Sequence, residues 1–425
     1  MTARDWLRDT TVTAVIHAIS WVERWQTGIV FNPLDPKHVA DPYPLYAELR
    51  RRGRVHQSRL TRGPVLSHYE DVAAALHDDR LSTNPSHSRG WPRQRKRLAA
   101  IGRTDDEIER RSILASDPPD HTRLRKLVSK AFTPRAISEL EARMGALVDE
   151  LLAPVRGTTF DLCEVLAWPF PVIVIAELLG VPRKDRARFK AWSDEVVLSI
   201  GVVKREGARR SLRAGRELGE YFTEIARERR EEPRDDLLSG LLAAEEEGDR
   251  LTLQEVLTMC SFLLVAGNET TAKMIGNGMA ALFRDPEQLD ALRTDPDLDA
   301  TAPDELLRFD GPVQMTTRNA LEDLELAGHR VEKGRQVILC LGSANRDPAR
   351  FAQPDRLDLA RVDNPHVALG HGRHFCLGAS LARLETRVAL RGLLDRFPGL
   401  EQAGDVVWGD NAVLRGVAHL PVRVG

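Results

Sequence analysis

Cys376 is the side chain in this sequence whose neighbours most clearly favour chemistry. It ends the stretch GHGRHFC, in which Gly370 and Gly372 supply the backbone freedom for a tight turn. Apolar residues at helical spacing follow it, so the start of a helix is expected there. The positive end of that helix, together with Arg373 and His374, favours the ionised form of the sulfur. The sequence therefore predicts a functional thiolate at this position.

Three kinds of thiolate chemistry compete for Cys376. A phosphatase-like nucleophile loop needs histidine directly before the cysteine and arginine six residues after it, but Phe375 and Ala382 stand there, which excludes it. A zinc site is permitted by the neighbouring histidines, although the stretch lacks paired Cys-x-x-Cys or His-x-x-x-His ligands (His366, His371, His374). Axial ligation of a haem iron accounts best for the glycines, because a flat macrocycle must approach the backbone closely.

A second candidate site is the adjacent acid and alcohol, Glu269 and Thr270, in the stretch VAGNETTA. An apolar run lies directly upstream, which indicates a buried helix. Burying a carboxylate mid-helix costs free energy unless it has a role. A threonine there can return a hydrogen bond to the carbonyl one turn earlier and bend the helix. The alternative is a solvent-facing glutamate at a helix bend.

The elements that must position these residues are predominantly helical. The longest predicted helix spans Leu251–Phe283, and its middle, CSFLLVAG, is apolar all round. Strand signals are few and short, in PVLSHY, in LELAGHRVEKGRQVILC and in LPVRV at the end. The stretch 82–104 is rich in proline, glycine and arginine and is predicted to be a long irregular loop. We therefore expect a single large, mainly α domain with a small β region.

Composition restricts the class of protein. The chain has 425 residues and a formal net charge of −2, which provides no general attraction to nucleic acid. Its cysteines are few and widely separated, so a reducing, cytoplasmic location is expected. No apolar run reaches the roughly 18 residues of a membrane span. All cysteines except Cys376 are expected to be inert packing residues (Cys163, Cys260, Cys340).

The N-terminus differs from the rest of the chain. Residues 1–30 place apolar side chains on one helical stripe, and three of the seven tryptophans lie in the first 25 positions. We expect an amphipathic helix there, as an extension to a domain that spans 31–425. Docking onto that domain is favoured, because the helix lacks the lysine- and arginine-rich face of a membrane-surface helix. Weak peripheral membrane contact through residues 1–26 is the alternative, since tryptophan favours the lipid boundary.

The stretch GHGRHFCLG resembles the haem-binding loop of the cytochromes P450, whose pattern is Phe-Gly-x-Gly-x-His-x-Cys-x-Gly. It matches at both glycines, His374, Cys376 and Gly378, and it departs at Leu369, which replaces the phenylalanine. The resemblance implies the cytochrome P450 fold and a haem b with Cys376 as its axial iron ligand. It also implies that Gly370, His374 and Gly378 belong to the cofactor-binding loop.

The resemblance continues in order from about Phe31 to the C-terminus. VAGNETTA is similar to the family's oxygen-activating helix, which implies that Glu269 and Thr270 relay protons. A Glu-x-x-Arg pair and an arginine completing its network are implied to be structural (Glu305, Arg308, Arg346). The haem propionates have four candidate partners (His121, Arg125, Arg318, His374). Substrate contacts are expected from the loop around 91–113, the long helix and two later segments, 312–317 and 411–414 (Phe262, Val265, Ala266, Val313, Val413).

The implied activity is a monooxygenase that hydroxylates or epoxidises an apolar, mid-sized organic substrate: a terpenoid, steroid, fatty acid or polyketide. A chain of this length leaves no room for a reductase, so electrons from NAD(P)H would arrive through a separate ferredoxin or flavodoxin with its reductase. A basic patch near the thiolate is the candidate docking surface (Arg123, Lys126, Lys130, Arg373). Two alternatives stay open: a peroxygenase of the same fold, which the Glu269–Thr270 pair disfavours, and a zinc or binding protein without haem.

Overall fold

The computed structural model describes residues 16–33, 35–109, 112–131, 134–199, 205–246 and 248–424. Its helices are α2 (Pro36–Ala40), α3 (Tyr43–Arg52), α4 (Tyr69–His77), α5 (Trp91–Ala100), α6 (Asp105–Glu109), α7 (Asp120–Ala131), α8 (Pro134–Leu152), α9 (Pro169–Leu178), α10 (Arg186–Val196), α11 (Arg205–Glu231), α12 (Leu237–Ala243), α13 (Leu253–Arg284), α14 (Pro286–Thr294), α15 (Ala302–Asp310), α16 (Leu341–Ala344) and α17 (Ala379–Arg396). Its strands are β1 (Val55–Ser58), β2 (Gly63–Leu66), β3 (Leu81–Ser82), β4 (Thr159–Asp161), β5 (Glu245–Glu246), β6 (Asp249–Arg250), β7 (Thr316–Ala320), β8 (Leu324–Leu326), β9 (His329–Val331), β10 (Gln336–Leu339), β11 (Glu401–Gln402), β12 (Val407–Trp408), β13 (Val417–His419) and β14 (Pro421–Arg423).

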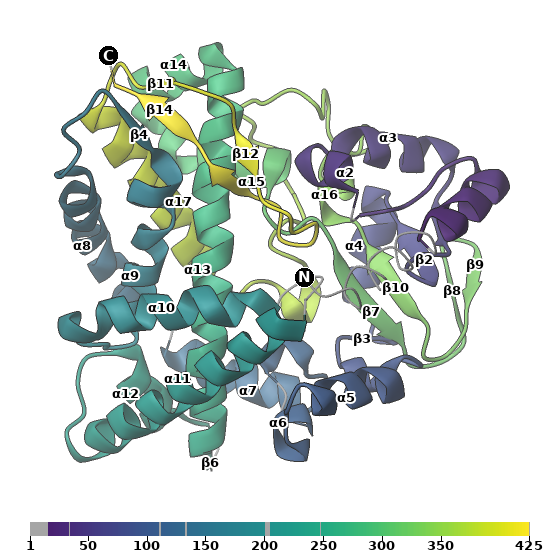
Figure 1. Ribbon diagram of the computed structural model, residues 1–425, viewed down its shortest axis with the longest axis horizontal. Helices are drawn as coiled ribbons and strands as arrows, with labels where there is room; N and C mark the ends of the chain where they lie inside the picture. The colour runs from purple at the N-terminus through teal and green to yellow at the C-terminus, as the bar shows by residue number, and fades with distance from the viewer. Residues whose placement is uncertain are drawn as a thin grey trace, which may run out of the picture.

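Helix α13 crosses the whole molecule and is the element around which the others pack (Figure 1). A capping box fixes its start: the Thr252 hydroxyl accepts a hydrogen bond from the Glu255 N–H, and the Glu255 carboxylate accepts one from the Thr252 N–H. Because its middle is apolar on every side, it is buried among α9, α11, α15 and α17. The long buried helix predicted from the sequence is confirmed.

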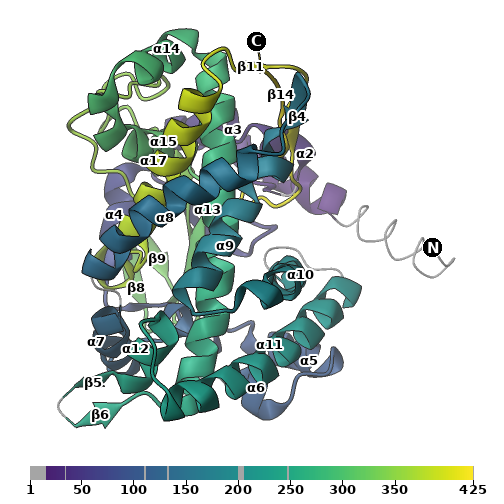
Figure 2. The ribbon, with the colours of Figure 1, turned by 90° about the vertical axis from the view of Figure 1, so that its left-hand side faces the viewer.

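Two large apolar clusters surround α13. One joins it to α8, α9 and α17, and the other joins it to α7, α10, α11 and α12. Figure 2 shows α8 and α9 crossing in front of α13. Three cysteines predicted to be inert are buried (Cys163, Cys260, Cys340). The main apolar core is therefore helical, as the sequence predicted.

The largest sheet lies beside this helical core and has the strand order β1-β2-β10-β7-β3. Strands β2 and β10 pair in parallel, and the other pairs are antiparallel. The predicted strand segments correspond to β2, the β8–β9 hairpin, β10 and β14. No separate strand signal marked β7, which carries Arg318 and pairs with β10 and β3.

The prediction of a long irregular loop over 82–104 was wrong. Helix α5 occupies 91–100 within it, and α6 follows directly. The proline that suggested a loop sits in the first turn of α5, where its missing N–H costs nothing. The remaining residues are arginine, lysine, glutamine, leucine and alanine, which are good helix formers.

The N-terminal helix, residues 16–27, lies against the β1–β2 hairpin. Its Glu23 is fully buried and accepts hydrogen bonds from the backbone N–H groups of Phe31 (2.9 Å) and Arg59 (2.8 Å). Residues 1–15 of the predicted N-terminal extension lie outside the described part of the chain. Among the described helices, none is long and apolar enough to cross a membrane.

Candidate active site

Cys376 lies in a tight loop that precedes α17. Its N–H donates to the Leu369 carbonyl over 2.9 Å, which closes the loop. Gly370 and Gly372 adopt φ angles of 73° and 63°, where a side chain would be strained. A Cβ at Gly372 would also lie 3.0 Å from His77 Nδ1, so the loop packs closely on the end of α4. The predicted glycine-dependent turn is confirmed.

The electrostatics of the sulfur differ from the prediction. Burial raises the pKa of the Cys376 thiol, and this outweighs the Gly378 N–H and the charges of Arg125 and Arg383, which act in the opposite direction. Arg373 instead forms an ion pair with Asp79. Without a bound metal, burial therefore outweighs the local charges that favour the thiolate. A coordinated metal ion would supply the missing positive charge, because a coordinating thiol is deprotonated.

On α13, the predicted bond from Thr270 to the carbonyl one turn earlier is confirmed. Its hydroxyl donates to the Ala266 carbonyl over 2.6 Å. Glu269 is half-buried and forms an ion pair with Lys273, one turn later on the same helix. A Cβ at Gly416 would lie 2.2 Å from Lys273 Cγ, so the lysine stem is packed against the C-terminal segment. Sequence reasoning missed Lys273, although the four-residue Glu-to-Lys spacing is a recognisable signal.

The Cys376 loop and α17 meet α13 beside the acid–alcohol pair. Leu369 packs with Met274 of α13 and Leu307 of α15 in one apolar cluster. Glu385 of α17 is buried and receives a hydrogen bond from Thr271, the residue that follows Thr270. The departure from the family pattern at position 369 is therefore accommodated by aliphatic packing. Burial raises the pKa of Glu385 to about 8, although the bond from Thr271 works to lower it.

The four predicted propionate partners converge from α7, β7 and the Cys376 loop. The rings of His121 and His374 lie 4.1 Å apart between centroids. Burial, followed by the charges of His121, Arg318 and other arginines, lowers the pKa of His374 to about 3. Burial likewise lowers the pKa of Arg318 to about 10. His121 Nε2 is buried and has no hydrogen-bond partner among the described residues.

This cluster fits the carboxylates of a haem. The buried guanidinium of Arg318, with Arg125 nearby and an orphaned nitrogen on His121, requires anions for compensation. Among the described residues, no carboxylate lies within ion-pairing distance of Arg125 or Arg318. Cys376 supplies a soft thiolate donor close by, and Arg125 acts electrostatically on both groups. The donor set therefore suits an iron porphyrin with two acidic side chains.

The Glu305–Arg308 pair is a fully buried structural centre. Arg308 donates to both carboxylate oxygens of Glu305 over 2.7 and 2.8 Å, and to the carbonyls of Asn345 and Pro354. Arg361 completes the network by donating from Nε to Glu305 over 3.1 Å. Nothing in the sequence marked Arg361, because its distance along the chain from Glu305 follows no helical period.

The expectation that Arg346 completes this network was wrong. Its guanidinium stacks over Tyr43 at 3.5 Å and Phe309 at 3.9 Å, and its Nε donates to the Phe309 carbonyl. It belongs to a neighbouring network in which Asp310 pairs with Arg415 and accepts from Tyr43 over 2.6 Å.

The five predicted substrate contacts are all partly accessible (Phe262, Val265, Ala266, Val313, Val413). The two later segments are brought together by a bridge between Val313 and Leu414 and by a bond from the Gln314 N–H to the Val413 carbonyl over 3.0 Å. The predicted loop 91–113 bears a surface hollow of about 610 Å³ between α5 and α6. Its walls include Trp91, Arg95 and Glu109.

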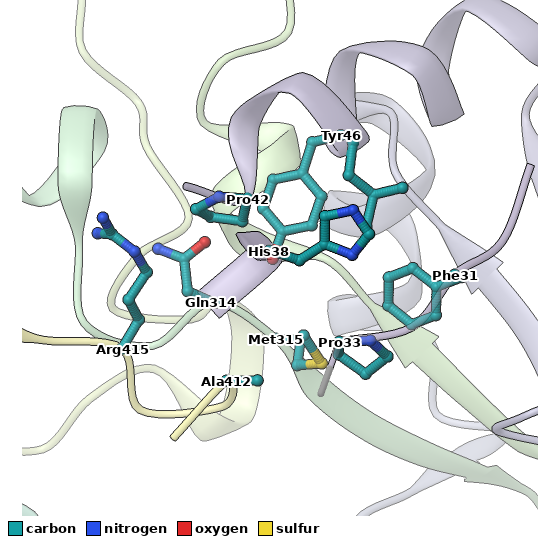
Figure 3. A pocket seen from close by; sticks show the side chains of 10 residues that line it. Phe31, Pro33, His38, Pro42, Tyr46, Gln314, Met315, Ala412 and Arg415 are labelled. Carbon is teal, nitrogen blue, oxygen red and sulfur yellow. The ribbon is translucent and has the colours of Figure 1, made fainter. Parts of the chain in front are cut away.

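A much smaller pocket lies behind the 312–317 segment. Figure 3 shows Tyr46 of α3, Met315 and Arg415 converging on it from different parts of the chain. Its volume of about 10 Å³ holds a single water at most, so it is a packing gap and not a substrate site.

The predicted basic patch is weaker than the sequence indicated. Arg123 pairs with Asp249 and Glu255, each over 2.9 Å, and Arg373 pairs with Asp79. Lys130 donates to the Glu245 carbonyl over 2.7 Å. Lys126 is exposed. Much of the predicted positive charge is therefore compensated within the chain.

The fold and this site define a haem-thiolate protein, and comparison with known proteins agrees. Residues 203–408 match the family model described as Cytochrome P450. The chain is 40% identical to the cytochrome P450 monooxygenase PikC of Streptomyces venezuelae, over 95% of this chain and 97% of that protein. It is 41% identical to a vitamin D(3) 25-hydroxylase of Pseudonocardia autotrophica, over 91% of this chain and 94% of that protein.

Solved structures show the same relationship. One is the bacillaene polyketide synthase cytochrome P450 PksS of Bacillus subtilis. It superposes on this chain with a TM-score of 0.84 at 35% sequence identity, and the match covers 93% of this chain and 100% of that one. The chain belongs to the cytochrome P450 family. It is therefore a haem-thiolate monooxygenase with the mainly helical P450 fold.

Proposed function

We propose that this monooxygenase hydroxylates or epoxidises an apolar, mid-sized organic molecule of the terpenoid, steroid, fatty acid or polyketide class. The observation that carries the proposal is a set of partly accessible aliphatic and aromatic side chains on α13 and the two later segments (Phe262, Val265, Ala266, Val313, Val413). Two relatives, the vitamin D(3) 25-hydroxylase and the bacillaene polyketide synthase P450, support the same range.

Cys376 would hold the haem iron, and four side chains would bind the propionates (His121, Arg125, Arg318, His374). The haem, when bound, supplies the redox chemistry that splits O₂. One oxygen atom enters a C–H or C=C bond of the substrate. The other leaves as water, with two electrons from a redox partner and two protons from solvent.

Thr270 and Glu269 would deliver those protons. The Thr270 hydroxyl would accept a proton at Oγ1 and would release its bond to the Ala266 carbonyl when it passes its own proton on. The Glu269 carboxylate is 25% exposed and thus reaches solvent, and Lys273 restrains it on the same helix. Gly370, His374 and Gly378 would form the loop beneath the cofactor.

Electrons from NAD(P)H would come through a separate ferredoxin or flavodoxin with its reductase. The partly compensated patch around Lys126 is the proposed docking area, and net positive charge there suits an acidic partner. NAD(P)H consumption should then saturate with ferredoxin or flavodoxin and fall at high salt. Substrate turnover driven by peroxide, with none from reduced ferredoxin, would contradict this electron route.

Two measurements test the proposal. The reduced, CO-bound protein should show the absorption band of a thiolate-ligated haem, and Cys376→His should abolish that band. Spectral titration with a panel of terpenoids, steroids, fatty acids and polyketides should then give a spin-state change with at least one class. Absence of the thiolate band in the native protein would disprove the cofactor assignment, whereas a silent panel would disprove only the substrate class.

A further inference from the structure

Two tryptophans stand out on the surface of the N-terminal helix. Trp21 and Trp25 are 71% and 78% exposed, and their four-residue spacing places both on one face of the helix spanning 16–27. In Figure 1 this helix is the dark purple element at the right-hand edge of the molecule. Indole rings combine a large apolar surface with one N–H donor, a combination suited to a boundary between water and lipid.

The outward orientation of these rings is fixed by the opposite side of the helix. Glu23 is 0% exposed and is held by N–H donors of Phe31 and Arg59, and its carboxylate lies 2.8 Å from His56 Nε2. Burial acts to raise the pKa of Glu23, but the hydrogen bonds from these partners outweigh it and lower that pKa. Rolling the helix to bury the tryptophans would therefore expose or strand this carboxylate.

Exposed arginines from the helix itself and from neighbouring elements lie near the tryptophans. Arg24 lies between the tryptophans in sequence and is exposed. Arg59, from the β1–β2 hairpin, donates to the Gln26 side chain over 2.6 Å, and Arg52, from α3, donates to the Thr27 carbonyl over 3.1 Å. All three side chains are exposed. Arg24 therefore lies on the helix beside the tryptophans, and Arg59 adds a second exposed cation at the end of the helix, whereas Arg52 is ion-paired with Glu48.

We propose that this surface, formed by Trp21, Trp25, Arg24 and Arg59, rests on an anionic lipid bilayer. The helix lies parallel to the membrane, the indoles sit at the headgroup level, and the guanidinium groups face lipid phosphates. Charge complementarity selects anionic over neutral lipid, and the anchoring of Glu23 makes the surface rigid before contact. The contact is peripheral and reversible, and it is independent of which substrate the enzyme oxidises.

The test uses the full-length, haem-loaded protein and sedimentation with lipid vesicles. Vesicles of phosphatidylcholine mixed with phosphatidylglycerol should bind the protein, and pure phosphatidylcholine should bind it weakly. Trp21→Ser with Trp25→Ser should reduce binding about tenfold or more. The matched control is Val362→Ser, because Val362 is 91% exposed elsewhere on the surface and its loss should change nothing. Arg24→Gln with Arg59→Gln should reduce binding to the anionic vesicles only.

Folding and alternative partners are controlled separately. Both tryptophans are exposed, so the double variant should keep the wild-type CO spectrum and melting temperature. In a Trp6→Phe background, brominated lipid should quench the tryptophan fluorescence of the protein that retains Trp21 and Trp25. This quenching should be lost when Trp21→Phe and Trp25→Phe are added. Unchanged vesicle binding by the double serine variant would overturn the proposal. A second result would also overturn the proposal: the wild type forms a dimer in sedimentation velocity but does not bind vesicles, and the double serine variant abolishes that dimer.

Discussion

Arg361 donates from Nε to the Glu305 carboxylate over 3.1 Å, although 56 positions separate the two residues along the chain. Arg308 already occupies both oxygens of that carboxylate, so Glu305 carries two guanidinium partners at a fully buried position. The Asp358 N–H adds a further bond over 2.9 Å. The segment before the Cys376 loop is therefore tied directly to α15.

Replacing Arg361 should destabilise the protein without touching the haem. Arg361→Gln removes one of two charges that compensate a buried carboxylate, and we expect a loss of about 1–3 kcal/mol in the free energy of unfolding. Urea denaturation measures this loss of stability. Arg350→Gln is the matched control, because Arg350 pairs with the exposed Asp363 and should cost well under about 1 kcal/mol. Equal effects of the two changes would contradict the assigned role.

Glu385 should make stability fall as pH rises. Burial raises its pKa from 4.5 to about 8 in the folded protein. The folded state therefore favours the protonated form, and this contribution is complete below pH 4.5 and is lost progressively up to about pH 8. Glu385→Gln stays neutral, so its melting temperature should lack this decline and exceed that of the wild type at pH 8. The control is Glu401→Gln, because Glu401 forms an exposed ion pair with Arg423. This variant should keep the wild-type dependence of melting temperature on pH.

Thr270→Ala should uncouple electron consumption from product formation. Without the hydroxyl, proton delivery is lost, and product per NAD(P)H should fall at least about tenfold. Thr270→Ser should restore most of the coupling. Thr258→Ala is a matched control on the same helix, since Thr258 makes the same back-bond to Gln254 over 2.7 Å at an exposed position. Normal coupling in Thr270→Ala would refute the relay.

Arg318 should hold the cofactor by charge. Arg318→Gln removes a buried cation facing the proposed propionates, and we expect haem loss to apomyoglobin to accelerate about tenfold or more. The haem-to-protein ratio after purification provides a second readout. Arg330→Gln on the exposed β9 strand should leave both unchanged. A normal retention of haem by Arg318→Gln would remove this residue from the proposed site.

Several features were determined by local sequence alone. The glycines around Cys376 require left-handed backbone angles, the Thr252–Glu255 pair caps a helix, and a buried helix is apolar all round. Each of these follows from backbone geometry within a few residues, so each could be read before the fold was known. The order of these motifs then sufficed to indicate the haem-thiolate class.

Other features were decided only by the tertiary structure. Arg361 rather than Arg346 reaches Glu305, and burial rather than the nearby arginines sets the pKa of Cys376. The Arg59 side chain reaches the tryptophan-bearing helix at Gln26 from the β1–β2 hairpin. Contacts of this kind have no characteristic spacing, and burial depends on what the rest of the chain packs over a residue. The sequence alone determined the chemistry available to this protein, whereas folding decided which charges meet and which side chains lose water.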